Sequence, residues 1–206
     1  MTTNNKQKPS NQELRTRKDL LLAAGRLLKR GRRPSMDEVA EEAMVSRATA
    51  YRYFRSVDAL LVEAPIDEAV EDPEKIFAGD SSEDAEERID RAEATLHKVT
   101  YENERQLRVV LANAISRDPG DVTIPPRQNR RLPLIEAALA TARHRIRDND
   151  YKNLCAALAM IFGPESMIVF RDVLNLDEKT ARRVKSWAVR ALVRAALQSS
   201  GSDKVS

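Results

Sequence analysis

Three signals for the start of a helix follow one another within a short stretch of this chain. Ser35 and Glu38 have the Ser-x-x-Glu spacing of a capping box, in which each side chain bonds the other residue's backbone amide at a helix N-terminus. Ser46 and Ser56 are further residues of the type that caps a helix N-terminus. The two helices between these starts must be short, with a tight break that ends at Ser46. The pattern predicts a helix, a turn and a second helix over residues 36–54.

A longer helix is predicted before this motif, and another after it. Ser10 and Glu13 form a further capping-box pattern, and Gly31 is of the type that follows a helix C-terminus. Apolar residues at helical spacing should line the buried face of this first helix: Leu20, Ala24, Leu27 and Leu28. The helix that starts after Ser56 meets Pro65, which must kink or end it because proline has no amide hydrogen.

The rest of the chain is also predicted to be helical. Ala, Leu, Arg and Glu dominate, whereas there are only four Phe, four Tyr, one Trp and six Gly, which is a helix-forming composition. Periodicity gives helices over 82–116, 130–147, 150–174 and 177–198, a linker at 72–82, a loop at 119–126 and a loose tail at 199–206. We expect an all-α fold with two domains, a three-helix helix-turn-helix domain over 10–64 and a larger helical domain over 65–200.

Composition excludes several kinds of site. The single cysteine, Cys155, excludes an intrachain disulfide and a cysteine-based zinc site. The two histidines, His97 and His144, are far apart on charged helical stretches, where we expect both to be exposed. We therefore expect no metal and no cofactor. No apolar run reaches the ~18 residues of a membrane span, and residues 1–9 are too polar for a secretory signal, which favours the cytoplasm.

The net charge of +3 hides a segregation of charge along the chain. Residues 1–35 hold ten basic residues against two acidic ones, a net of +8, and residues 65–95 hold twelve acidic residues against three basic ones, a net of −9. A chain of this kind can present one face to a polyanion and keep the rest away from it. The alternative is a set of solvated helix faces, because the carboxylates of 83–93 alternate with arginines at spacings that suit pairing on a helix surface.

The second short helix of the motif has a surface suited to nucleic acid. Ala50 and Phe54, four residues apart, should face the core. The positions expected to point outward are Arg47, Ala48, Thr49, Tyr51, Arg52 and Tyr53. Such side chains contact guanine edges, thymine methyl groups and phosphates, and the second helix of a helix-turn-helix lies in the DNA major groove. The sequence therefore predicts a DNA-binding surface on this helix.

The N-terminal part of the chain resembles the DNA-binding domain of the TetR family of transcriptional regulators. The resemblance covers about residues 14–64 and includes the Ala-Ala and Leu-Leu pairs of the first helix, Val39-Ala40 and the run SRATAYRYF that ends at Phe54. It implies an all-helical, homodimeric regulator, most commonly a repressor, whose C-terminal domain binds a small molecule that releases double-stranded operator DNA.

The resemblance and the side-chain chemistry together give a set of candidate DNA-binding residues: Lys18, Ser35, Ser46, Arg47, Ala48, Thr49, Tyr51, Arg52 and Tyr53. Arg47 is the candidate for base recognition, because arginine bonds guanine O6 and N7 with two N–H groups; the alternative is a solvated arginine. Thr49 and Tyr51 match family positions that contact phosphate, and the alternative for Tyr51 is packing on the first helix. A basic arm or phosphate clamp is expected from Lys6, Lys8, Arg15, Arg17 and Lys18.

Two positions depart from the family pattern. The family often has glycine in the turn, where this chain has Met44, and a left-handed conformation there would cost a non-glycine residue roughly 1 kcal/mol. The family also commonly has a phosphate-binding lysine just after the second short helix, where this chain has Val57. One phosphate contact should be missing, with Arg52, Arg55 or the N-terminal arm in its place.

The C-terminal region suggests a dimer interface and a ligand site. Small residues in a stripe on the last helix would let two helices approach closely, with larger residues beside them: Val184, Trp187, Ala188, Ala191, Leu192 and Ala195. A ligand cavity between the central helices would be lined by Tyr101, Leu107, Arg108, Val110, Leu111, Asn113, Leu139, Met160, Phe162, Met167 and Phe170. Ordinary packing within the chain is the alternative for both sets.

Two other classes of function were weighed. No Gly-rich phosphate loop, HExxH or Gly-x-Ser-x-Gly motif is present, so we expect no catalytic residues and no enzyme. A helical ligand- or protein-binding module that has kept the fold but not specific DNA binding is the other alternative.

Overall fold

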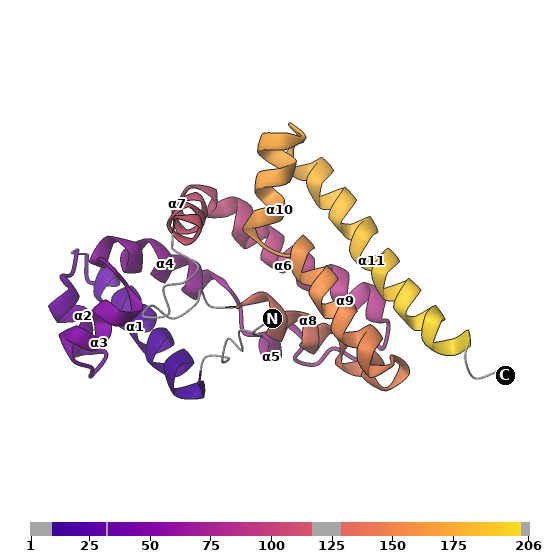
Figure 1. Ribbon diagram of the computed structural model, residues 1–206, viewed down its shortest axis with the longest axis horizontal. Helices are drawn as coiled ribbons and strands as arrows, with labels where there is room; N and C mark the ends of the chain where they lie inside the picture. The colour runs from indigo at the N-terminus through magenta and orange to yellow at the C-terminus, as the bar shows by residue number, and fades with distance from the viewer. Residues whose placement is uncertain (1–9, 32, 117–128, 203–206) are drawn as a thin grey trace, which may run out of the picture. The chain divides into compact units, whose positions relative to one another are not determined.

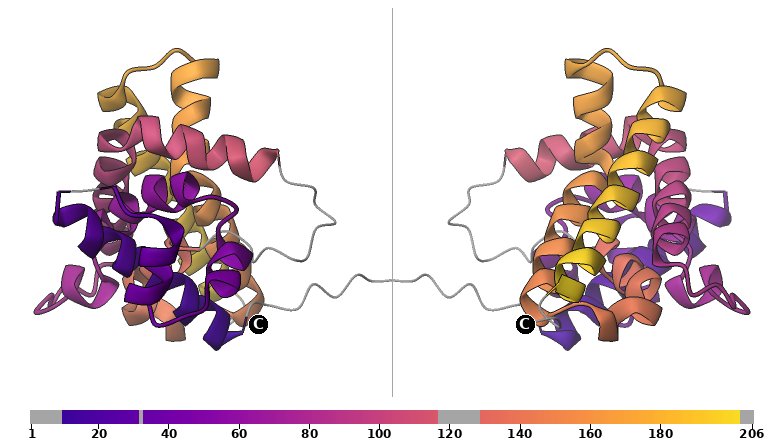
Figure 2. Two further views of the ribbon diagram at one scale, coloured as in Figure 1. Left: turned by 90° about the vertical axis from the view of Figure 1, so that its left-hand side faces the viewer. Right: turned by 90° about the vertical axis from the view of Figure 1, so that its right-hand side faces the viewer.

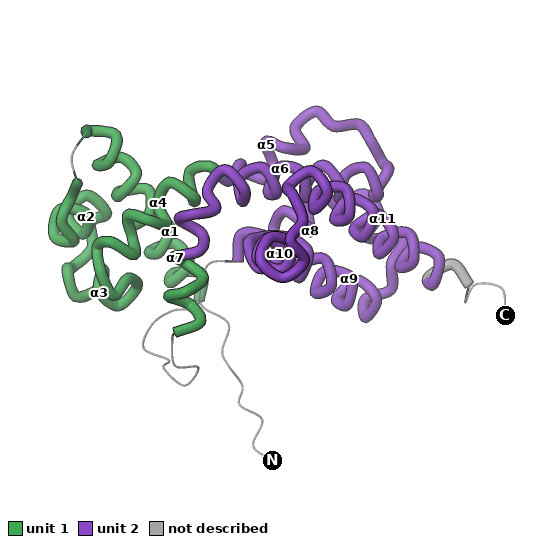
Figure 3. Tube along the Cα trace, turned by 90° about the horizontal axis from the view of Figure 1, so that it is seen from above, with its two compact units in different colours: residues 1–69, 109–128 green, residues 70–108, 129–206 purple. Residues whose placement is uncertain are grey.

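The computed structural model describes residues 10–31, 33–116 and 129–202. All regular elements in this part of the chain are helices (Figures 1 and 2), which confirms the predicted all-α fold. The chain forms two compact units, the first from residues 1–69 and 109–128 and the second from residues 70–108 and 129–206 (Figure 3). Lys6, Lys8 and the loop predicted at 119–126 lie outside the described residues.

The first unit contains four helices whose starts follow the predicted capping signals. They are α1 (Asn11–Lys29), α2 (Met36–Glu42), α3 (Arg47–Tyr53) and α4 (Val57–Ala69). Both capping boxes form: Glu13 and Glu38 accept from the amides of Ser10 and Ser35 at 2.7 and 2.8 Å, and the serine hydroxyls accept in return. Gly31, with φ +79°, follows the end of α1 in the left-handed conformation.

The core of the first unit holds the short helices in place. α1 packs against α4 and α2, and α2 packs against α3. The buried face of α1 follows the predicted spacing at Leu20, Ala24 and Leu27. Because α2 and α3 have only seven residues each, they depend on this shared core, since isolated helices of that length are not stable in water.

Pro65 was predicted to kink or end its helix. It does not end the helix, because α4 continues through Pro65 to Ala69. Proline cannot donate to the Leu61 carbonyl, one turn earlier. Pro65 is exposed, so the missing backbone hydrogen bond falls on the outer side of the helix.

The second unit holds the remaining helices, some with boundaries that differ from the prediction. They are α5 (Pro73–Ile76), α6 (Ala85–Glu102), the start of α7 (Glu104–Ile115), α8 (Arg131–Leu139) with the 3₁₀ turn Ala140–Arg145, α9 (Asp148–Ile161), α10 (Pro164–Ile168) with the π turn Val169–Val173, and α11 (Glu178–Ser202). The predicted linker at 72–82 thus contains a short helix, and residues 199–202 belong to α11 rather than to a tail. None of the described helices alone is long and apolar enough to span a membrane, although α9 and the segment Pro164–Val173, bent by 48°, pass that test as a pair.

α11 packs along α6 and α9, and α8 packs against α6 and α9 (Figure 1). The helices enclose an apolar core that includes Ile89, Ile135, Leu158 and Val189. A second, smaller apolar cluster contains Tyr101, Met167 and Ala181.

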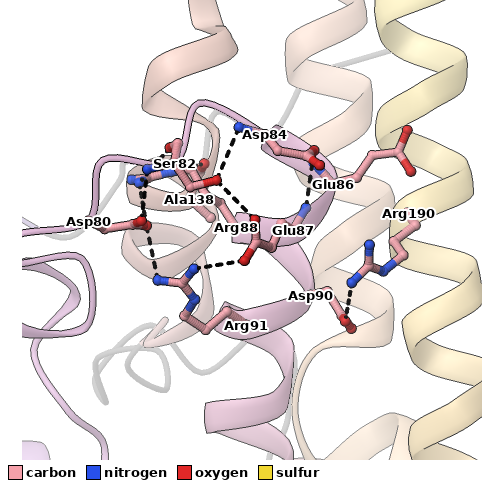
Figure 4. A network of polar contacts seen from close by, with 10 residues as sticks. All are labelled: Asp80, Ser82, Asp84, Glu86, Glu87, Arg88, Asp90, Arg91, Ala138 and Arg190. Atoms are coloured by element: carbon pink, nitrogen blue, oxygen red, sulfur yellow. Dashed lines mark hydrogen bonds and ion pairs between the residues drawn. The ribbon is translucent and has the colours of Figure 1, made fainter.

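The acidic start of α6 forms both local bonds and bonds to other elements; Figure 4 shows Glu87 bonded to Arg91 and Asp90 bonded to Arg190 of α11. The buried Arg88 donates to the carbonyls of Ala137 and Ala138 at 3.1 Å and to Asp80 at 2.7 Å. Glu87 and Arg91 form the predicted pair four residues apart. Two other carboxylates bond arginines of α11 instead: Glu86 with Arg194 at 2.6 Å, and Asp90 with Arg190 at 2.7 Å. These carboxylates therefore fix α6 to α11.

Candidate functional site

The turn between α2 and α3 has the backbone geometry of a helix C-terminal motif that normally contains glycine. The Val45 amide donates to the Ala40 carbonyl and the Met44 amide to the Glu41 carbonyl, both at 2.9 Å. Met44 has φ +55°, so the left-handed position considered from the sequence is present. Its side chain is 92% exposed and contributes nothing to the core. Residue 44 therefore keeps a strained backbone without compensating burial.

One face of α3 is buried, and it includes a residue that we predicted to point outward. Ser46 caps the helix by accepting from the Thr49 amide at 3.0 Å. Ala50, Tyr53 and Phe54 are buried in the core of the first unit. The outward placement of Tyr53 is wrong, because it lies three residues after Ala50 and so shares its face of the helix.

The opposite face of α3 is open. Arg47, Ala48, Tyr51 and Arg52 are exposed and Thr49 is half-buried. Arg47 donates from NH1 to Asp37 Oδ2 at 3.1 Å, and its Nε lies 3.1 Å from Asp37 Oδ1. Its guanidinium also lies 5.5 Å from the centre of the Tyr51 ring. This face presents a cation, an aromatic hydroxyl and a small residue within two turns of helix.

The basic residues of α1 divide into exposed and buried ones. Lys18 and Arg15 are exposed. Arg17 is buried: it donates to Glu63 at 2.7 Å and its guanidinium lies 4.2 Å from the centre of the Phe54 ring. The expectation that Arg17 belongs to a phosphate clamp is therefore wrong, since its charge is used inside the unit.

Val57 stands where the family commonly has a phosphate-binding lysine, and its side chain makes an apolar contact instead. Val57 is half-buried and packs against the core of the first unit. Ser35 and Ser46 are exposed at the starts of α2 and α3.

The fold and this surface define a helix-turn-helix DNA-binding protein. Residues 20–64 match the family model described as bacterial regulatory proteins, tetR family. This match supports a TetR-family DNA-binding transcription regulator, with the family's DNA-binding domain at residues 20–64. Neither a curated protein nor a solved structure matches the chain.

The candidate dimer residues lie on the open side of α11. The buried residues of this helix are Ala181, Lys185, Val189 and Val193. None of the six candidates is fully buried: Trp187 and Ala195 are exposed, and Val184, Ala188, Ala191 and Leu192 are half-buried. Leu192 packs against the core of its own unit.

The candidate ligand residues belong to different apolar clusters and to both units. Phe162 and Leu139 belong to the main core of the second unit, whereas Tyr101, Met167 and Phe170 belong to the smaller apolar cluster. Met160 and Asn113 are exposed, Leu107 and Leu111 are buried, and Val110 is half-buried. Val110, Leu111 and Asn113 fall in the first unit.

Arg108, predicted as a polar group that orients a ligand, already donates hydrogen bonds to two carboxylates of its own chain. It donates to both Asp172 oxygens at 2.7 Å and to Glu104 at 2.8 and 2.9 Å.

A buried polar cluster in the second unit was missed from the sequence. Lys185 Nζ lies 2.6 Å from Glu93 Oε1, and Arg182 NH1 lies 3.3 Å from Glu93 Oε2. His97 is buried beside them, which corrects the expectation that it is exposed; His144 is exposed. Burial, reinforced by the Lys185 and Arg182 charges, lowers the pKa of His97 to about 4. Burial also raises the pKa of Glu93 and lowers that of Lys185.

The tautomer of His97 follows from its neighbour. Nδ1 lies 3.5 Å from Lys185 Nζ, and a charged ammonium only donates, so this contact favours the tautomer with the hydrogen on Nε2. The His97 and Tyr101 rings stack with centroids 4.4 Å apart. His97 Nε2 and the Tyr101 hydroxyl are both buried without a hydrogen-bond partner among the described residues. The sequence did contain a signal, since Lys185 interrupts the otherwise apolar four-residue spacing of Ala181, Val189 and Val193.

Proposed function

We propose that the protein is a homodimeric repressor that binds a specific operator and is released from it by a small molecule. The observation that carries the proposal is the open face of α3, with the exposed Arg47 and Tyr51 on a helix anchored by Ala50. Arg47 would bond a guanine edge. The other DNA contacts would come from Lys18, Ser35, Ser46, Ala48, Thr49, Tyr51 and Arg52, and most would go to phosphates, which fix register without specifying sequence. Tyr53 would act from the core by holding α3 rather than by touching DNA.

The open side of α11 supports a dimer. Trp187 is 72% exposed, and half-buried small residues lie on the same helix. A large exposed aromatic beside small residues is typical of a helix that packs on a second copy. Two-fold symmetry would place two α3 helices at half-sites one helical turn of DNA apart, about 34 Å.

The unpartnered polar atoms in the second unit support an effector. A buried donor without a partner costs about 1–3 kcal/mol, and a ligand that accepts from His97 Nε2 and the Tyr101 hydroxyl would remove that cost. Met167, Ile168 and Phe170 offer it an apolar environment. The effector would release DNA by binding the non-DNA-bound state more tightly, and a hundredfold difference in affinity amounts to about 2.7 kcal/mol.

The test is fluorescence-anisotropy titration with DNA from beside the protein's own gene, at two salt concentrations, with random DNA as competitor. Binding that resists the competitor and falls steeply with salt would support a specific regulator. The same complex then serves to screen small molecules for release, and adding the operator to a transcription assay distinguishes repression from activation. Binding that disappears under competitor would instead favour the alternative, a helical module that has kept the fold without specific DNA binding.

A further inference from the structure

Arg47, the proposed base-contacting residue, is held by a side chain from another helix. Asp37 lies in the first turn of α2 and contacts the Nε and NH1 side of the Arg47 guanidinium at 3.1 Å. Both side chains are mostly exposed, and an ion pair of this kind adds little to folding stability. Asp37 also lies in the first turn of α2, where the helix dipole favours a carboxylate; that contribution to stability does not depend on the contact with Arg47.

The contact with Asp37 leaves the base-binding edge of Arg47 available. A guanidinium has five N–H groups, and guanine O6 and N7 are bonded by two parallel ones. Asp37 accepts from NH1 alone, and NH2 has no hydrogen-bond partner in the part of the chain that the structure describes. The end of the fork formed by NH1 and NH2 thus keeps the N–H groups that a guanine edge requires.

A second contact restrains Arg47 from within α3. The Tyr51 ring lies one turn further along the helix, 5.5 Å from the Arg47 guanidinium carbon. An arginine side chain normally loses much rotamer freedom when it is fixed on DNA. Because Asp37 and Tyr51 already restrict the side chain, part of that loss precedes binding.

We infer that Asp37 is a positioning residue for sequence recognition: it orients Arg47 toward a guanine edge and disfavours its use as a phosphate contact. The inference rests on the proposed function, in which Arg47 contacts a base. The Asp37 carboxylate holds the Arg47 guanidinium away from the phosphates that supply sequence-independent affinity. Arg47 should therefore add little to the binding of random DNA, while it bonds the guanine edge at the correct site. The effect of Asp37 is on the ratio of the two affinities, not on affinity alone.

The test measures that ratio for matched variants. An operator is first selected with the wild-type protein from random-sequence duplexes, and the Kd values for the operator, for its single-base variants and for random DNA are then measured by anisotropy at fixed salt. The test variant is Asp37→Ala. The control is Glu41→Ala, because Glu41 is an exposed acid on the same helix and its carboxylate forms no ion pair among the described residues.

We expect Asp37→Ala to lower the operator-to-random ratio by roughly three- to tenfold, with the loss concentrated at one guanine position. Glu41→Ala should strengthen binding to both DNAs alike and leave the ratio unchanged. In an Arg47→Ala background, Asp37→Ala should cause no further loss of ratio, because Asp37 acts through Arg47.

Two results would overturn the inference. One is an equal effect of Asp37→Ala and Glu41→Ala on the ratio, which would make Asp37 a surface charge like any other. The other is a loss of ratio that persists in the Arg47→Ala background. A wild-type protein that selects no operator at all would instead overturn the proposed function together with this inference, so the two failures are distinguishable. Circular dichroism of each variant checks that the fold is retained.

Discussion

Lys185 Nζ lies 2.6 Å from Glu93 Oε1, and both side chains are 1% exposed. This pair joins α11 to α6 inside the second unit. Enclosing two opposite charges costs solvation energy that their attraction only partly repays, whereas leaving one of them unpaired is strongly unfavourable. We therefore expect the pair to specify how α11 lies against α6 more than it stabilises the unit.

We predict that Lys185→Met destabilises the protein by about 3–5 kcal/mol, because Glu93 is left buried with Arg182 as its remaining cationic partner among the described residues. The double change Glu93→Leu with Lys185→Met should recover most of this loss, since neither charge of the pair then remains buried. Urea unfolding followed by circular dichroism measures both. Lys98→Met, which removes an exposed partner of Glu102, serves as the control and should change stability by less than about 0.5 kcal/mol. A double variant as unstable as the single one would contradict this account.

The lowered pKa of His97 predicts a loss of stability in mild acid. His97 titrates at about 4 in the folded protein and at about 6.5 when unfolded, so the unfolded state takes up a proton first as the pH falls. The resulting destabilisation should grow from pH 6.5 to about 4 and reach on the order of 3 kcal/mol.

Other groups around His97 titrate too, so its contribution must be measured as a difference in unfolding free energy between two variants. Lys185, Arg182, Glu178 and Tyr101 also face the ring. The raised pKa of Glu93 acts in the opposite direction, since its proton uptake favours the folded state as the pH falls. The unfolding free energy of the wild type minus that of His97→Gln, compared at pH 7 and pH 4.5, isolates the histidine. A difference independent of pH would rule out a buried neutral His97.

Met44 provides a test of backbone strain in the helix-turn-helix. Met44→Gly should stabilise the protein by about 0.5–1 kcal/mol, because glycine adopts φ +55° without steric cost and the exposed methionine side chain packs against nothing. Asn175→Gly is the matched control, since Asn175 has φ +51° but asparagine tolerates this conformation. Thermal unfolding should show a clearly larger gain for residue 44, and equal gains would mean that the turn is not strained.

The sequence predicted those features that depend on neighbouring residues. The capping boxes at Ser10 and Ser35 and the cap at Ser46 involve groups three residues apart, so spacing alone reveals them. The left-handed conformation at Met44 was considered from the family resemblance, because the family often has glycine at this position of the turn. The features that were missed depend on partners far away in the sequence, or on which face of a helix a residue occupies. Nothing near His97 in the chain shows that Lys185 will enclose it, or that Tyr53 rather than a neighbour completes the core beside Ala50.

The proposed dimer predicts a specific effect at Trp187. Trp187→Ala should shift the protein from dimer to monomer at micromolar concentration, since buried aromatic anchors dominate interface energies. The monomer should keep its helical content, because Trp187 is 72% exposed and takes little part in its own core. Sedimentation equilibrium at several concentrations measures the change, with Ile115→Ala, another exposed apolar residue, as the control. A wild-type protein that is monomeric, or a Trp187 variant that remains dimeric, would contradict the proposed interface.

The half-buried Val57 allows the absent phosphate contact to be restored. Val57 begins α4. It stands at the position where the family commonly has a phosphate-binding lysine, and its side chain packs on the core of the first unit. A lysine can keep its methylene stem on that apolar surface and extend its ammonium into solvent. We therefore predict that Val57→Lys strengthens binding to operator and random DNA alike and steepens the dependence of log K on log salt by about one unit. Titrations at four salt concentrations measure the slope, and Val57→Leu controls for the change in packing. An unchanged slope with Val57→Lys would show that residue 57 does not lie beside the DNA backbone.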